Sequence, residues 1–329
     1  MKKLFFTFLC LSLTAIFAAG CASKAASPFN RSGFLEQKNV RTVAPVNVIC
    51  EYSVFYEKDE KSGYNVDFNV DNETSRLKTS LSVYLSDGSV GESGKSYYLF
   101  ETDLVINGEC SINGDKTAFS DSVKTKVYFE GTGAALKPVQ SFRSAKTSAL
   151  EGDSNDLKLV RYDYDYTVSY DDNNAYVTVT PNDTDQKYAA QGEYTLENVF
   201  DGNYIDNELM LFAPRAMSLD NLLTSFKTVD ALAKTAHDMK LTYKENGNIT
   251  FAAKSSVLSE NGALFYRTSP KVSTLSLEVN SSYSGAAHVL SFAAESEDHE
   301  YQRLIKAEYP ATFGVGKFVF LISSSEISF

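Results

Sequence analysis

The sequence predicts a mainly β (α+β) fold, built from antiparallel strands and carrying one helical segment. Apolar and polar residues alternate over many short stretches, which is the period of a strand with one buried face. Turn residues separate these stretches at fairly regular spacing. One segment, near 207–226, instead has its apolar residues at helical spacing. Together these observations favour a meander sheet, a barrel or a sandwich with one helix added.

Residues 1–20 are expected to be an export signal. Lys2 and Lys3 precede an apolar run from Leu4 to Ala19. That run is shorter than the roughly 20 residues that a membrane-spanning helix needs. Small residues end it directly before Cys21. A basic start, a short apolar run and a small-residue exit are typical of a cleaved signal peptide.

The four residues Ala18-Ala19-Gly20-Cys21 resemble the lipobox of bacterial lipoproteins, although that box prefers Leu where this chain has Ala18. The resemblance implies a lipid anchor on Cys21, which would become the new N-terminus. Each buried CH₂ of such a lipid contributes about 0.8 kcal/mol, so two or three acyl chains would hold the protein permanently at a membrane. The alternative is ordinary cleavage near Gly20, with Cys21 left as a free thiol.

Residues 21–45 are predicted to form a lipidated tether. They contain Ala, Ser, Lys, Asn and Gly without a sustained period and close at Pro45. As a flexible coil they would span about 25–30 Å. Residues 46–329 are expected to form a β-rich extracytoplasmic domain, with a possible division into parts 46–119 and 120–325. Because Ala22 and Ser23 follow the cysteine without an acidic residue, analogy favours the outer membrane or the cell surface.

The charge balance argues against nucleic acid as a partner. The chain has 31 basic and 42 acidic residues, a net charge of −11. Loss of Lys2 and Lys3 with the signal leaves 29 basic residues and a net charge of about −13. Such a surface repels phosphate backbones and anionic lipid head groups. Nucleic acid is therefore not an expected partner, and the membrane is the expected one, through the lipid on Cys21.

Two cysteines remain after Cys10 leaves with the signal and Cys21 takes the lipid. Cys50 and Cys110 both lie in strand-like stretches, in a compartment that often permits disulfides. A bridge would close a loop of about 60 residues and stabilise the fold by roughly 4 kcal/mol. The alternative is a pair of buried thiols. We favour the disulfide.

Alternation is clearest at 157–170, where Val160, Tyr162, Tyr164, Tyr166 and Val168 share one face. Four short polar stretches are expected to be hairpin turns, each joining two strands. They are Asp87-Gly88, Asn113-Gly114, 171–174 and Asn246-Gly247. Further strands are expected at 46–56, 64–70, 97–106, 123–129, 272–280, 287–293, 301–308 and 316–322. The last is apolar on both faces and should be central.

The predicted helix begins at Asn207, where Asp206 can cap it and Glu208 suits the helix dipole. Pro214 should kink or end its first part. A second part carries Leu219, Leu222, Leu223 and Phe226 at helical spacing, with a weaker continuation to 237.

The stretch 204–217, with its Tyr-Asp-Asn-Glu pattern followed by an apolar helix and Arg215, is similar to a segment of an uncharacterised family of bacterial secreted or lipoprotein domains. The run 301–308 resembles the closing strands of that family, and the resemblance covers 120–325. The family is grouped with lipoprotein-carrier-like half-barrels. It therefore implies a strongly curved antiparallel sheet, or open half-barrel, that wraps the helix.

The same resemblance implies a concave apolar face for an acyl chain or another hydrophobic ligand. Tyr162, Tyr164 and Tyr166 would be candidates for its wall. The alternative is that this aromatic face simply packs under the helix, as aromatic stripes usually do.

No motif of an enzyme is present: the sequence lacks a nucleophile elbow, a phosphate loop, a metalloprotease motif and a dinucleotide fingerprint. His237, His288 and His299 stand far apart and are expected to be surface or internally satisfied residues. Asp163 and Asp165 share a strand face, where solvated charge is the simplest interpretation. We therefore expect no catalytic residues, no cofactor and no metal.

A polar cluster of Asp206, Asn207, Glu208 and Arg215 is conceivable, although helix capping explains these residues with fewer assumptions. Three functions remain. The first is a non-enzymatic envelope lipoprotein that binds a hydrophobic or lipid-like ligand. The second is a surface-exposed structural or host-interaction lipoprotein that engages other proteins. The third is a hydrolase, which requires a histidine within hydrogen-bond reach of a Ser or Asp in a cleft.

Overall fold

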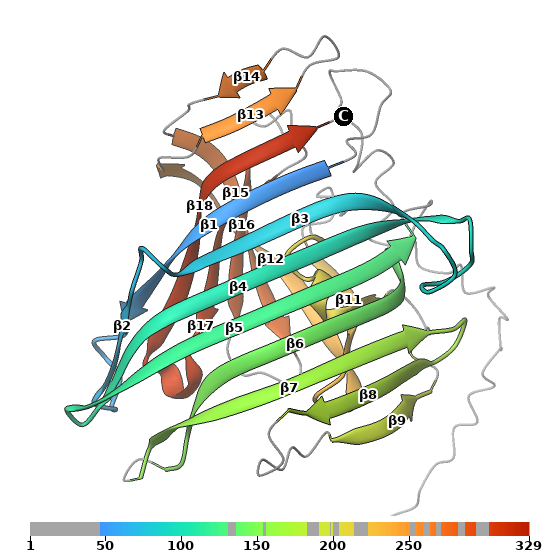
Figure 1. The fold of residues 1–329 in the computed structure, drawn as a ribbon. Helices are drawn as coiled ribbons and strands as arrows, with labels where there is room; N and C mark the ends of the chain where they lie inside the picture. Colours follow the sequence, from blue (N-terminus) through green and yellow to red (C-terminus); the bar gives the residue numbers. More distant parts are fainter. Residues whose placement is uncertain are drawn as a thin grey trace, which may run out of the picture.

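The computed structural model describes residues 47–130, 136–153, 156–182, 191–197, 199, 204–213, 223–250, 254–258, 264–267, 271–281, 287–293 and 303–328 (Figure 1). The signal peptide, Cys21 and the tether lie outside these residues, so the predictions made for them stay predictions. Within the described part, no helix has the length and apolarity that a membrane crossing requires.

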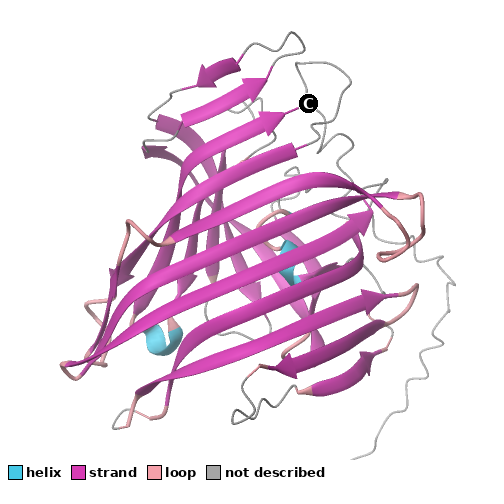
Figure 2. Ribbon diagram, in the orientation of Figure 1, coloured by secondary structure: helices cyan, strands magenta, loops and turns pink. Residues whose placement is uncertain are grey.

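The prediction of a mainly β fold is confirmed, because the described residues form one large, mostly antiparallel sheet (Figure 2). The strands are β1 Asn47–Lys58, β2 Val66–Val70, β3 Arg76–Leu85, β4 Ser96–Ile112, β5 Asp115–Glu130, β6 Lys137–Glu151, β7 Lys158–Tyr170, β8 Ala175–Pro181, β9 Gly192–Leu196, β10 Tyr204–Asp206, β11 Leu223–Asp230, β12 Thr235–Thr250, β13 Lys254–Leu258, β14 Leu264–Arg267, β15 Lys271–Ser281, β16 His288–Ala293, β17 Leu304–Pro310 and β18 Gly316–Ser328.

Strand pairing divides the sheet into two halves that meet at β1. Strands β3 to β9 follow one another as a meander, with β2 also paired to β4. On the other side, β1 pairs with β18, and the sheet continues through β17, β16, β15, β12, β11 and β10. We call β2–β9 the first half and β10–β18 the second half. Strand β5 runs across the suggested boundary at 119/120.

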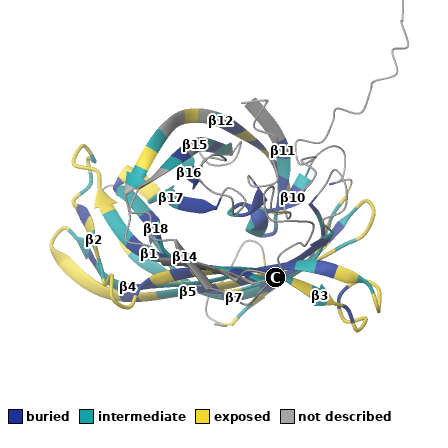
Figure 3. Cartoon of the chain, turned by 90° about the horizontal axis from the view of Figure 1, so that it is seen from above, coloured by how far each residue is buried: buried dark blue, intermediate teal, exposed yellow. Residues whose placement is uncertain are grey.

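The second half lies over one face of the first half (Figure 3). Strand β10 and the short 3₁₀ turn η1, Asn207–Leu209, contact β6 and β5. Over the residues that the structure describes, the sheet does not close on itself and is not strongly curled. The finding therefore supports the antiparallel sheet but not the strong curvature that the resemblance implies.

Alternating burial shows which face of each strand forms the core. In β1, Val48, Cys50, Tyr52 and Val54 are buried while their neighbours are partly exposed. Strand β18 lies between β1 and β17, as expected of a central strand. Each strand with one buried face thus follows the period-two pattern seen in the sequence.

Phe212, which follows η1, packs between the rings of two other phenylalanines. Its ring lies 5.4 Å from that of Phe100 and 5.6 Å from that of Phe129, measured between centroids. Phe129 and Phe212 are at most 1 % exposed. Aromatic pairs at such distances add to the free energy gained from burial. This cluster fixes η1 against β4 and β5.

Three predicted hairpin turns are confirmed, and one is wrong. Asn113 and Gly114 have φ angles of 54° and 95°, the left-handed pair that a two-residue hairpin needs. The loops after Leu85 and Tyr170 also join paired strands. Asn246-Gly247, however, lies inside β12, because both residues pair with Leu275 and Thr274 of β15. Pairing with β15 therefore outweighs the local preference of Asn-Gly for a turn.

The predicted helix at 207–226 is wrong wherever it can be described. Asp206 does cap a turn, since its carboxylate accepts the N–H of Glu208 at 2.8 Å, but η1 ends at Leu209. Residues 223–230 form β11, paired with β12, and residues 235–237 belong to β12. Phe226 and Val229 of β11 are buried, and pairing with β12 along the strand outweighs the helical spacing. Residues 214–222 lie outside the described part.

The disulfide suggested between Cys50 and Cys110 does not form in this structure. Both side chains are buried as thiols. Cys50 lies opposite Thr79, and Thr79 lies opposite Thr102. Cys110 is eight residues further along β4, which is about 26 Å at about 3.3 Å per residue. Disulfides need Cα atoms roughly 4.4–6.8 Å apart, so this register excludes the bond.

Candidate functional site

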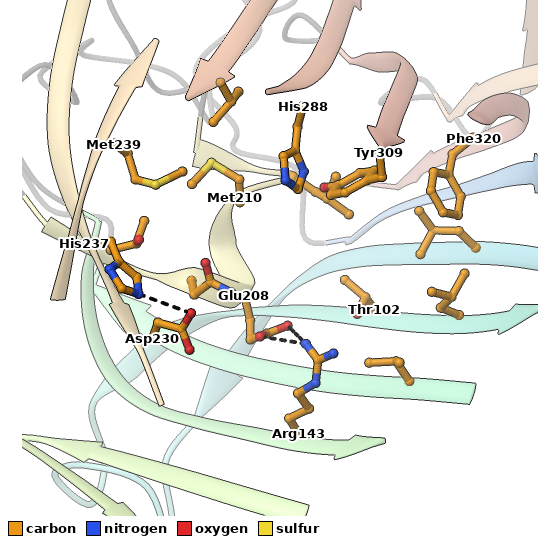
Figure 4. Close-up of a pocket in the computed structure, with 17 residues that line it drawn as sticks. Thr102, Arg143, Glu208, Met210, Asp230, His237, Met239, His288, Tyr309 and Phe320 are labelled. Carbon is orange, nitrogen blue, oxygen red and sulfur yellow. Dashed lines mark hydrogen bonds and ion pairs between the residues drawn. The ribbon is translucent and has the colours of Figure 1, made fainter. Parts of the chain in front are cut away.

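A cavity of about 370 Å³ lies between the two halves of the sheet. Its volume falls within the range of about 300–1,000 Å³ that is usual for small-molecule sites. The first half contributes one wall and the second half the other, with the η1 turn between them (Figure 4). The lining residues are Leu77, Thr102, Leu104, Val123, Arg143, Asn207, Glu208, Met210, Leu211, Thr228, Asp230, His237, Met239, Val279, His288, Tyr309 and Phe320.

One end of this cavity is apolar. Tyr309 and Phe320 lie there on neighbouring strands β17 and β18, with ring centroids 5.7 Å apart. Met210 and Met239 both reach the cavity from the second half (Figure 4). Methionine is flexible and polarizable, so it adapts to ligands of irregular shape. Apolar surface thus makes up most of the wall.

The polar end of the cavity carries a largely buried ion pair between Arg143 of β6 and Glu208 of η1. One guanidinium nitrogen, Nη1, donates to both carboxylate oxygens of Glu208, at 2.9 and 3.0 Å. The hydroxyl of Tyr166 donates to Glu208 Oε1 at 2.6 Å. Burial lowers the pKa of Arg143, but the negative charge of Glu208 outweighs it, so that this pKa lies above its ordinary value. Breaking such a pair leaves an uncompensated buried charge.

Asp206, the residue before η1, holds the same turn through hydrogen bonds. It is 2 % exposed and accepts a hydrogen bond from the hydroxyl of Tyr170 at 2.5 Å. Burial, together with the nearby charge of Glu208, raises the pKa of Asp206 to about 6. The sequence therefore found two members of this polar network, Asp206 and Glu208. The cation that pairs with Glu208 is Arg143, while Arg215 lies outside the described residues.

A second polar pair stands at the same end, on β11 and β12. The Nε2 atom of His237 lies 3.5 Å from Oδ2 of Asp230 (Figure 4). The other carboxylate oxygen, Oδ1, accepts the backbone N–H groups of Leu232 and Ala233 at 2.9 and 3.0 Å. These two backbone bonds fix the orientation of Asp230 and place a carboxylate at the cavity wall.

His288 completes the wall beside Tyr309, whose ring meets it edge-on at a centroid distance of 4.4 Å. Burial lowers the pKa of His288, so this imidazole is neutral at neutral pH. Sequence reasoning treated His237 and His288 as surface or internally satisfied residues and missed their shared cavity. No local signal could have found it, because strand pairing over 50 residues brings them together. His299 lies outside the described residues.

The three tyrosines proposed as a ligand wall belong to a core cluster instead. Tyr164 and Tyr166 are 4 % and 6 % exposed and pack with Val177, Val179 and Val229. Tyr162 is partly buried against the same cluster. None of the three lines the cavity between the halves. The aromatic stripe is therefore core, and the hydroxyl of Tyr166 contributes to the site through its hydrogen bond to Glu208.

The two aspartates on the other face of β7 are separate from this site. Asp163 pairs with Lys146 at 3.1 Å, and Asp165 lies opposite Ser144 and Thr180. Among the described residues, no group of three or more His, Cys, Asp or Glu side chains is placed to hold a metal ion. The site is thus an amphipathic cavity with a charged end.

The fold and the site define a mainly β protein with an internal amphipathic cavity between two halves of one sheet. Comparison with protein-family models, with curated proteins and with solved structures finds no match to this chain.

Proposed function

We propose that this chain is a membrane-anchored, non-enzymatic bacterial envelope lipoprotein whose cavity binds a hydrophobic or lipid-like ligand. The observation that carries the ligand part is the cavity of about 370 Å³, with Met210, Met239 and Phe320 in its wall. Apolar surface removed from water contributes roughly 25 cal/mol per Å² to binding. In this proposal the open sheet holds a ligand between its two halves, as a half-barrel would.

The anchor part rests on the sequence of the first 21 residues. Lipid on Cys21 would keep the domain within about 25–30 Å of a bilayer, through a flexible tether. A protein at that distance can exchange ligands with the membrane. The outer membrane or the cell surface is the proposed location. The surface-exposed, protein-binding role remains the alternative function.

Native mass spectrometry tests the ligand proposal. The full chain with Cys21→Ser is purified from an exporting host, so that no covalent lipid confuses the masses. We expect a non-covalent adduct of lipid-like mass. In Met239→Trp, a larger side chain fills the cavity and should remove this adduct. The matched control is Val83→Trp, at a position that is 47 % exposed and outside the cavity wall.

Absence of any adduct in the protein that retains Met239, or equal adduct in both tryptophan variants, would contradict the ligand proposal. Metabolic labelling with an alkyne analogue of palmitate tests the anchor separately. The full chain should be labelled, and Cys21→Ser should abolish the label. Protease treatment of intact cells then separates the two functions, because digestion indicates the surface-exposed role.

A further inference from the structure

The polar end of the cavity carries three charged side chains. Asp230 and Glu208 bring two carboxylates to this end, and Arg143 brings one guanidinium. His288 lies toward the other end, edge-on to the ring of Tyr309, and burial lowers its pKa. Two carboxylates, Glu208 and Asp230, thus stand against one guanidinium, Arg143, at this end.

The single cation at this end is already engaged. Nη1 of Arg143 contacts both oxygens of Glu208, which leaves no full positive charge for a bound anion. An arriving carboxylate or phosphate would meet two carboxylates in a partly desolvated space. Like charges that approach in such surroundings repel each other more strongly than in water. The arrangement disfavours anionic heads.

Asp230 supplies an acceptor that points toward the cavity. Its Oδ1 is held by the backbone N–H groups of Leu232 and Ala233, while Oδ2 lies on the His237 side at 3.5 Å from Nε2. Its side chain is 25 % exposed, so a head group can reach it. A hydroxyl or an ammonium donates to such an oxygen, whereas a carboxylate cannot.

We infer that the cavity selects amphiphiles whose head donates hydrogen bonds and has no negative charge, with the head at Asp230 and the tail toward Tyr309 and Phe320. This inference rests on the proposed ligand-binding function and names its ligand class. Long-chain alcohols and amines belong to that class, and fatty-acid anions do not.

Displacement of a fluorescent probe tests the selection. The protein is the full chain with Cys21→Ser, and the probe is the uncharged dye N-phenyl-1-naphthylamine. Lauryl alcohol, laurylamine and laurate compete at about pH 8, where the acid is ionised. We expect the alcohol and the amine to displace the dye at concentrations about tenfold below that of laurate, which corresponds to about 1.4 kcal/mol.

Asp230→Asn removes the carboxylate and keeps an oxygen for the backbone bonds of Leu232 and Ala233. The preference over laurate should then shrink by at least about threefold. The matched control is Asp165→Asn, on the strand face that points away from Tyr164 and Tyr166. That variant should keep the full preference. A circular-dichroism melt verifies that each variant is folded.

The outcomes separate the two proposals. If none of the three lauryl compounds displaces the dye, the ligand-binding function itself is wrong. If laurate binds as well as or better than the alcohol, the hydrophobic cavity stands and the inferred head-group selection is overturned. Equal loss of preference in both aspartate variants also overturns it, because the effect would then be one of overall charge.

Discussion

Asp206 gives the sharpest test of the site's energetics, because its burial has a predictable effect on stability. Burial and the charge of Glu208 raise the pKa of Asp206 from 3.8 to about 6. The folded protein therefore binds this proton more tightly than the unfolded chain does. Above about pH 6 the ionised carboxylate is buried at a cost, and below about pH 3.8 the cost is absent. Stability should thus rise, through this group, as the pH falls through 6.

The size of the effect follows from the two pKa values. A difference from 3.8 to about 6 corresponds to about 3 kcal/mol of destabilisation at high pH. About 1.4 kcal/mol of this change falls between about pH 5 and pH 8, by the same linkage relation. Asp206→Asn has no proton to bind and lacks this dependence.

Urea denaturation of the full chain with Cys21→Ser, with and without Asp206→Asn, measures the effect. As the pH falls from about 8 to 5, the free energy of unfolding of the protein with Asp206 should rise by about 1.4 kcal/mol relative to that of Asp206→Asn. Asp171→Asn is the control. Hydrogen bonds led by that from Tyr176 lower the pKa of Asp171 to about 2, so its contribution is constant in this window. A flat difference for Asp206→Asn, or one of opposite sign, would refute the reasoning.

Four further predictions concern packing and pairing. Arg143→Ala should cost about 3–5 kcal/mol, because it leaves Glu208 charged and buried, whereas Lys126→Ala, which breaks an exposed pair with Glu101, should cost less than about 1 kcal/mol in the same urea titration. Phe212→Ala should cost about 3–5 kcal/mol, since it empties the space between Phe100 and Phe129, and a loss below about 1 kcal/mol would contradict that packing. Gly108→Ala should destabilise the fold, because the new Cβ would clash with the carbonyl oxygen of Asn69. Gly63→Ala meets no atom within 4 Å and should change the melting temperature little. Mass spectrometry without reductant should show Cys50 and Cys110 as two thiols, and a mass lower by two hydrogens would contradict the strand register between them. Because burial raises the pKa of Cys110 to about 11, alkylation of this thiol should proceed only after unfolding.

Much of the sheet was predictable because its signal is local. The alternation at 157–170 fixes which side chains of β7 are buried, and Tyr164, Tyr166 and Val168 are buried as expected. Asn113-Gly114 fixes a hairpin because few other residue pairs adopt two left-handed conformations. Both features depend on neighbours in the sequence.

Predictions failed where a distant strand outweighed a local preference. The residues around Phe226 have helical spacing, yet they form β11 because β12 supplies a ladder of backbone hydrogen bonds. Asn246-Gly247 favours a turn, yet β15 extends it as strand. Backbone groups need partners, and a paired strand satisfies them as well as a helix does.

The sequence by itself determined many of the strands, their buried faces and most of the turns, since each follows from residues a few positions apart. It also holds the whole case for an anchor at Cys21. Only the tertiary structure decided that the second half of the sheet lies over the first. That placement brings Glu208 to Arg143, which is 65 positions away, and opens a cavity beside His237 and Asp230. The period of a strand specifies which face is buried, but it does not specify what covers that face.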